Sequence, residues 1–213
     1  MLPVLLAAIA LCAVAAIVSD WNEARTPLFK VLKPLTTILI AALAWSAPES
    51  GYRDGLLLAL GLSLLGDIAL MYESNGAFLA GLGSFLLAHL VFMLAFLHGV
   101  GHYTPPLWAA AFVLYGVALG TILVRRADAP LRVPVVIYAL VLTGMALTAL
   151  LRWQALGGVT GGYALLGAAL FVLSDSALGI RRFVGRYRGA QGLILSTYWG
   201  GIACIAWSAQ GAG

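Results

Sequence analysis

The stretch GLLLALGLSLLGDIALM, residues 55–71, decides the fold class. Apart from Ser63 and Asp67 it contains only apolar residues and glycine. About 20 residues of helix cross the hydrocarbon core of a bilayer, so a run of this kind predicts a transmembrane helix. An aspartate inside such a run is costly in lipid and is therefore a candidate functional residue.

Similar apolar runs fill the rest of the chain, with short connections between them. They lie at approximately 2–18, 31–46, 77–97, 107–124, 133–151, 161–179 and 191–208. Of the 213 residues, 62% are hydrophobic and 9% are charged, against about 25% charged in an average soluble domain. The composition excludes a water-soluble fold and predicts an all-α integral membrane bundle of eight transmembrane helices, forming one transmembrane domain over residues 1–213.

The first run resembles a secretory signal only superficially. No Lys or Arg precedes it, and its apolar stretch is longer than the roughly 7–15 residues of a signal core. We therefore expect residues 2–18 to be retained as the first helix.

The basic residues predict the orientation. All Lys and Arg except Arg53 and Arg152 lie in three connections, after the first, fifth and seventh runs. Basic connections stay in the cytoplasm, so both termini are expected outside, in what we predict to be a bacterial inner membrane. The same topology explains the net charge of +4, and no nucleic-acid partner is expected.

Two aspartates inside the runs are the main candidates for chemistry. Asp67 and Asp175 each lie about four residues before the cytoplasmic end of a predicted helix, and so at the same depth. The segments 65–70 and 173–178 align over them at a spacing of 108 residues. The alignment leaves open an arrangement of two parallel four-helix repeats.

Other polar residues are candidates as well, and of these Lys33, Tyr138, Gln191 and Tyr198 are expected near the same end of the bundle and His89 nearer the middle of its helix. The two cysteines, Cys12 and Cys204, have no metal-ligand spacing, and neither a metal nor a cofactor is expected. The candidates for binding or orienting a substrate are Lys33, Ser63, His89, Tyr138, Ser174, Gln191 and Tyr198. Taken singly, each is also explained by packing or by an interfacial position.

An ordered set of motifs resembles the YhhN-type lysoplasmalogenase family. The set comprises Lys33-Pro34, the segment 63–67 (SLLGD), Phe78-x-x-Gly81-x-x-x-Phe85-x-x-x-His89, Phe171-x-x-Ser174-Asp175, and Gln191 followed by Tyr198. The resemblance extends from the second to the eighth helix. One departure is Phe92, at a position where a tyrosine would be expected.

The resemblance implies hydrolysis of the vinyl ether bond at sn-1 of a lysoplasmalogen, with Asp67 and Asp175 as the catalytic pair. The partners would be a lysophospholipid substrate and the bilayer, and the products a fatty aldehyde with glycerophosphocholine or glycerophosphoethanolamine. Vinyl ether hydrolysis needs a protonated acid and a carboxylate that stabilises a cation, and two aspartates can supply both. The sequence does not assign which aspartate is the acid. Lys33 is the candidate phosphate contact, and Tyr138, Gln191 and Tyr198 are candidates for positioning the headgroup or water.

Two other classes of protein also use paired intramembrane aspartates. A proton-coupled transporter would place them inside a repeated bundle, although neither aspartate is expected near the midplane. An intramembrane aspartyl protease would share the Gly66-Asp67 dipeptide, but residue 64 is leucine where glycine is needed, and a Pro-Ala-Leu segment is missing.

Overall fold

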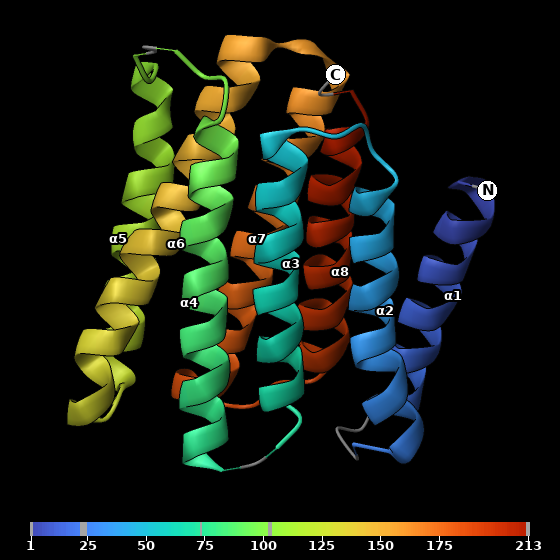
Figure 1. The fold of residues 1–213 in the computed structure, drawn as a ribbon. Coiled ribbons are helices and arrows are strands. Elements are labelled where there is room, and N and C mark those ends of the chain that lie inside the picture. Colours follow the sequence, from blue (N-terminus) through green and yellow to red (C-terminus); the bar gives the residue numbers. More distant parts are fainter. Residues whose placement is uncertain (1, 22–24, 73, 102–103, 212–213) are drawn as a thin grey trace.

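The computed structural model describes residues 2–21, 25–72, 74–101 and 104–211. In these ranges the chain forms eight α-helices that run side by side (Figure 1). They are α1 (Leu2–Ser19), α2 (Pro27–Trp45), α3 (Gly51–Ala69), α4 (Asn75–Leu97), α5 (Ala110–Arg126), α6 (Ala129–Leu156), α7 (Gly158–Gly179) and α8 (Ala190–Trp207). Shorter helical turns are η1 (Leu107–Ala109), η2 (Ile180–Val184) and η3 (Ser208–Gly211).

Seven of the eight helices are long and apolar enough to cross a membrane. The exception is α3, because every 18-residue stretch of it contains Arg53, Asp54 and Asp67. It nevertheless lies within the bundle, between membrane-spanning neighbours (Figure 1). The predicted all-α membrane bundle of eight helices is confirmed.

Hydroxyl side chains define where three helices begin. Thr26, Ser50 and Ser74 precede α2, α3 and α4, and each accepts a hydrogen bond from the backbone N–H three residues later. These caps satisfy donors that the first helical turn leaves unpaired. The sequence therefore fixes the start of three adjacent helices through local hydrogen bonds.

The helices pack in the same order in the two halves of the chain. In each half the first helix packs on the second, the second on the third, and the third on the fourth. The fourth helix of each half also packs on the second helix of the other, as α4 on α6 and α8 on α2. This pattern supports the four-plus-four arrangement that the two aspartate segments left open.

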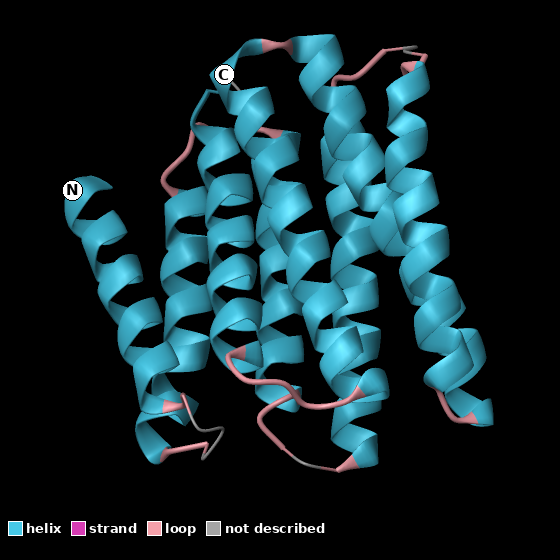
Figure 2. Ribbon diagram, turned by 180° about the vertical axis from the view of Figure 1, so that it is seen from behind, coloured by secondary structure: helices cyan, strands magenta, loops and turns pink. Residues whose placement is uncertain are grey.

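The two outermost helices are α1 and α5, and α8 lies in the interior (Figures 1 and 2). Only Ile9 and Ala16 are buried in α1, and only Gly120 and Leu123 in α5. The connections after α1, α3, α5 and α7 all lie at one end of the bundle, and the described chain begins and ends at the other (Figure 2). The basic connections identified in the sequence therefore share one end.

The helices that carry the candidate site, α7 and α8, approach each other closely. A Cβ added at Gly167 would lie 2.5 Å from the carbonyl oxygen of Gly201, and one added at Gly201 would lie 2.9 Å from the carbonyl oxygen of Gly167. Distances below about 3 Å are not seen for real Cβ atoms, so only glycine permits this contact. The glycine pair sets the separation of α7 and α8.

Candidate functional site

Asp67 lies in the last turn of α3 and is surrounded by donors. Its Oδ2 atom accepts hydrogen bonds from the hydroxyl of Thr37 at 2.7 Å and from the phenol of Tyr198 at 2.8 Å. The ammonium Nζ of Lys33 lies 3.4 Å from Oδ1. Both charged side chains are buried, and a buried ion pair of this kind is stable only when hydrogen bonds satisfy its remaining atoms. Asp67 therefore has its negative charge balanced by a cation and two hydroxyl donors.

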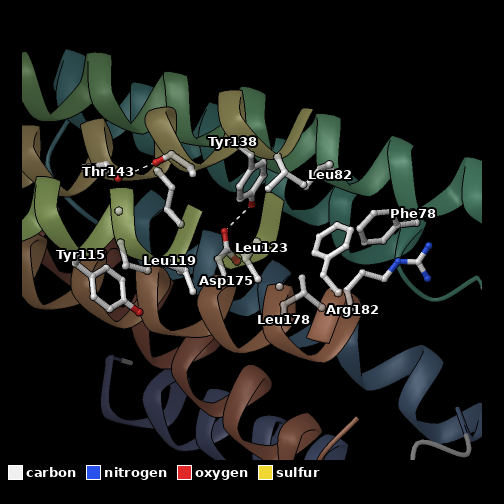
Figure 3. Close-up of a pocket in the computed structure, with 17 residues that line it drawn as sticks. Phe78, Leu82, Tyr115, Leu119, Leu123, Tyr138, Thr143, Asp175, Leu178 and Arg182 are labelled. Carbon is white, nitrogen blue, oxygen red and sulfur yellow. Dashed lines mark hydrogen bonds between the residues drawn. The ribbon is translucent and has the colours of Figure 1, made fainter. Parts of the chain in front are cut away.

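Asp175 lies near the end of α7 in a less polar environment. The phenol of Tyr138 donates a hydrogen bond of 2.5 Å to its Oδ2 atom, as Figure 3 shows. The Nε2 atom of His89 lies 3.5 Å from the same oxygen. The His89 ring packs edge-on against Tyr138 and Phe171 and is fully buried. Neither of its nitrogens has a hydrogen-bond partner in the described part of the chain.

The two aspartates are held by corresponding helices of the two halves. Asp67 on α3 receives hydrogen bonds from α2 of its own half and from α8 of the other. Asp175 on α7 receives its hydrogen bond from α6 of its own half and faces His89 on α4 of the other. Each carboxyl group thus depends on both halves of the chain.

Both carboxyl groups line one cavity of about 60 Å³, which we call the polar cavity. A single water molecule needs roughly 10–15 Å³ of such volume, so the polar cavity has room for several. The residues that line it include Asp20, Arg25, Lys33, Asp67, Ser174, Asp175, Arg181, Gln191 and Tyr198. The structure therefore brings the two aspartates to a common space that can hold water.

Asp175 also lines a second cavity, which we call the apolar cavity and which is drawn in Figure 3. Its walls are mostly aliphatic and aromatic side chains from α4, α5, α6, α7 and η2. Labelled examples in Figure 3 are Phe78, Leu82, Leu119 and Leu123. Asp175 and Leu178 line both cavities, so this carboxyl group lies where the polar space meets the apolar one.

A chain of hydrogen bonds joins residues that line the polar cavity near the basic connections. Asp20, at the end of α1, is fully buried and accepts hydrogen bonds from the side-chain amide of Gln191 at 2.6 Å and from the backbone N–H of Arg25 at 2.5 Å. The carbonyl oxygen of Gln191 accepts a hydrogen bond of 2.5 Å from Arg181. This network joins the end of α1, the start of α8 and η2 beside the polar cavity.

The structure places most of the sequence candidates around the aspartates. Lys33, Tyr198, Ser174 and Gln191 line the polar cavity, Tyr138 lines the apolar one, and His89 contacts Asp175. Ser63 is the exception, because its hydroxyl donates to the carbonyl oxygen of Ala59 within α3 and does not line either cavity. Ser174 likewise donates to a backbone carbonyl, that of Ile194 on α8.

Lys33 lies deeper in the second helix than the apolar run 31–46 predicts. Because α2 begins at Pro27, Lys33 is in its second turn and not at its start. Its side chain is 9% exposed and faces Asp67.

The sequence candidates do not include four polar residues of the site: Asp20, Arg25, Thr37 and Arg181. Thr37 lies one helical turn after Lys33 on the same face, a spacing that could have identified it. Arg25 and Arg181 are explained in the sequence by the topology of the basic connections, and Asp20 directly follows the first apolar run. The described residues contain no group of three or more His, Cys, Asp or Glu side chains arranged to hold a metal ion.

Comparison with known proteins agrees with the motifs. The model of the YhhN family matches residues 28–209. The human protein named lysoplasmalogenase TMEM86B is 31% identical over 180 residues, which cover 84% of this chain and 74% of the human protein.

A lysoplasmalogenase of Mycobacterium tuberculosis is 35% identical over 178 residues, covering 78% of this chain and 63% of the relative, so this chain spans less than two thirds of the mycobacterial protein. No solved structure is significantly similar to the chain.

Proposed function

The chain belongs to the YhhN family, and from this membership and the geometry of the site we propose that it is a lysoplasmalogenase. It hydrolyses the sn-1 vinyl ether bond of a lysoplasmalogen, releasing a fatty aldehyde and glycerophosphocholine or glycerophosphoethanolamine. The human and mycobacterial relatives that carry this name support the reaction. The proposal for individual residues rests on the geometry of this chain.

The position of Asp175 between the two cavities is the observation that carries the proposal. A lysoplasmalogen is polar at its headgroup and apolar along its alkenyl chain, and the vinyl ether lies where the two parts join. With the headgroup in the polar cavity and the chain in the apolar cavity, the vinyl ether lies beside Asp175. An apolar groove between α5 and α6 shares Gly116, Ala139 and Thr143 with the apolar cavity and continues the path for the chain.

Asp175 is assigned the role of the general acid. Its carboxyl proton is transferred to the second carbon of the alkenyl chain, which leaves an oxocarbenium ion at the first carbon. Water from the polar cavity bonds to that carbon and gives a proton back to Asp175. The hemiacetal then breaks its bond to the sn-1 oxygen, which takes the hydroxyl proton, and the products are an aldehyde and an alcohol. The net reaction consumes one water molecule.

Asp67 is assigned the role of the permanent anion. Lys33 and two hydroxyl donors stabilise its carboxylate. A fixed negative charge lining the same cavity stabilises the oxocarbenium ion as it forms, because charge interactions are strong where water is largely excluded. Tyr138 orients Asp175 through its hydrogen bond.

The reaction would take place at the cytoplasmic side of the bacterial inner membrane. The mouth of the polar cavity lies at the bundle end that carries the basic connections, which favour the cytoplasm. A cysteine in place of Arg188, in the connection after α7, should be labelled by a membrane-impermeant maleimide only in inverted vesicles. The label is followed against the same protein without that cysteine, because Cys12 and Cys204 are also present. Labelling in intact spheroplasts would reverse the orientation.

The test of the function is aldehyde release by the purified protein in detergent. The vinyl ether lysolipid should be cleaved, and the saturated 1-O-alkyl lysolipid should not, because it has no alkene carbon to accept the proton. Asp175→Asn and Asp67→Asn should each reduce the rate by about 10²–10⁴-fold, the usual contribution of general acid–base groups.

Asp54→Asn is the matched control, since Asp54 is also on α3 but its side chain is 64% exposed, and it does not line either cavity. Wild-type rates in a folded Asp175→Asn variant would refute the assignment of the acid. Uptake of the lysolipid by proteoliposomes without hydrolysis would instead indicate a transporter.

A further inference from the structure

Four arginines gather around the mouth of the polar cavity. Arg25 and Arg181 line both the polar cavity and a wider opening outside it, which we call the vestibule. Arg182 and Arg186 line the vestibule but not the polar cavity. Basic side chains therefore line the vestibule, whereas the polar cavity beside it also contains Asp20, Asp67 and Asp175.

The inner pair, Arg25 and Arg181, is held in place by the buried carboxyl group of Asp20. Arg25 has a backbone φ of 49°, in the left-handed region that non-glycine residues rarely adopt. The hydrogen bond from its backbone N–H to Asp20 and one from its guanidinium to the carbonyl oxygen of Met71 hold it there. Arg181 is connected to the same carboxyl group through Gln191.

A backbone held in an unfavourable conformation points to a positional requirement on the side chain it carries. Arg25, from the α1–α2 connection, and Arg181, from η2, line the same two cavities. Guanidinium groups bind phosphate oxygens through paired N–H donors, which makes such a pair suited to a phosphodiester. Lys33 instead lies inside the polar cavity, where its ammonium faces Asp67.

We propose that Arg25 and Arg181 bind the phosphate of the lysolipid headgroup at the boundary between the vestibule and the polar cavity. The inference rests on the proposed function and adds the part of the substrate that is recognised. The phosphate lies between the two guanidinium groups, the glycerol lies in the polar cavity, and the vinyl ether reaches Asp175. The outer arginines, Arg182 and Arg186, attract the anionic group toward the mouth.

The experiment measures binding separately from catalysis. The probes are 1-O-alkyl lysophosphatidylethanolamine, which has the phosphate but cannot be hydrolysed, and 1-O-alkylglycerol, which lacks the phosphate. Wild-type protein in detergent should bind the phosphate-bearing probe at least about tenfold more tightly, a difference of roughly 1.4 kcal/mol. Arg25→Gln and Arg181→Gln should each remove most of that difference and leave binding of 1-O-alkylglycerol unchanged.

Arg188→Gln is the matched control. It removes one positive charge from the α7–α8 connection, which also contains Arg181. Arg188 is exposed and lines neither the vestibule nor the polar cavity. Arg25→Lys and Arg181→Lys keep the charge without the planar donor pair, and intermediate affinity is expected. Equal affinity of the wild type for the two probes, or an equal loss in the Arg188→Gln variant, would overturn the phosphate assignment.

Competition distinguishes a lipid headgroup from free phosphate. Glycerophosphoethanolamine should displace the phosphate-bearing probe at lower concentration than inorganic phosphate does, because it also fills the polar cavity. Equal displacement by the two would assign the arginine pair to free phosphate and overturn the headgroup site. Selective binding of the probe with no cleavage of any vinyl ether would support the phosphate site while refuting the proposed function.

Discussion

Tyr138 of α6 donates its phenolic hydrogen to Asp175 of α7 over 2.5 Å, where the polar and apolar cavities meet. The tyrosine ring forms part of the apolar wall, and its hydroxyl occupies one lone pair of the carboxyl oxygen Oδ2. The remaining oxygen, Oδ1, is the one available to hold the proton. In the proposed mechanism, Oδ1 is therefore the oxygen from which Asp175 transfers its proton.

Removing that contact should slow the reaction without unfolding the protein. Tyr138→Phe leaves the ring in the wall but frees the carboxyl group to rotate, so we expect kcat to fall about tenfold, equivalent to one hydrogen bond of roughly 1–1.5 kcal/mol. KM should change little, because the chain still contacts the same ring. Steady-state aldehyde release is the measurement.

Tyr115→Phe serves as the comparison for Tyr138→Phe. Tyr115 lines the same apolar cavity, but its hydroxyl donates a hydrogen bond of 2.8 Å to the hydroxyl of Ser176 and not to Asp175. An equal fall in kcat for both variants would show that the Asp175 contact is not responsible.

The pair of Lys33 and Asp67 makes a prediction about stability. Lys33→Met leaves a buried carboxylate without its cation and should lower the free energy of unfolding by up to about 3–5 kcal/mol. Asp67 retains its two hydroxyl donors, so the loss should fall toward the lower end. Thermal unfolding in detergent is the measurement.

The double variant Lys33→Met, Asp67→Asn should recover most of that stability, because it leaves neither charge unbalanced. If the double variant is as unstable as Lys33→Met alone, the two side chains do not stabilise each other.

The width of the apolar cavity should determine which chain lengths are accepted. Leu119→Trp places a larger side chain in the wall contributed by α5, so it narrows the apolar cavity. We expect kcat/KM to fall by about tenfold or more for long alkenyl chains, which lose hydrophobic contacts, and to fall less for short ones. The same change at Leu114, which is on α5 but 69% exposed, should have no such effect. A uniform loss at all chain lengths would argue against this path for the chain.

The close contact between α7 and α8 should tolerate no side chain. Gly167→Ala places a methyl group against the backbone of Gly201 and Ile205, so the helices must separate at a cost of about 1–3 kcal/mol. Gly61→Ala on α3 is the control, because a Cβ there meets nothing within 4 Å. Unfolding temperatures of the two variants should differ clearly, and equal values would contradict the packing argument.

The fold was largely predictable from the sequence, because lipid demands long apolar helices and little else satisfies the backbone. All eight expected runs correspond to helices, although α6 extends from Ala129 to Leu156, beyond the expected 133–151, into more polar sequence. Hydrophobicity marks the part of a helix that is in lipid but does not mark where the helix ends.

The residues of the site were easier to predict from the sequence than the contacts between them. Asp67 and Asp175 are conspicuous because charges are expensive in lipid, whereas Thr37 is not, since a threonine in a helix can satisfy its own hydroxyl. The pairing of Lys33 with Asp67 depends on how α2 and α3 pack. Asp20 and Arg25 lie in the connection between α1 and α2, and only the folded chain brings Asp20 beside Gln191.

The fourth helix of each half packs on the second helix of the other half, and this packing determines whether the chain can be divided in two. Neither half alone contains both supports of either carboxyl group, since α8 serves Asp67 and α4 serves Asp175. Residues 1–103 and 104–213, produced as separate polypeptides, should each be inert, and their co-expression in one membrane should restore turnover. The proposed catalytic site lies between the two four-helix halves, as in enzymes whose active site is formed by residues of two subunits.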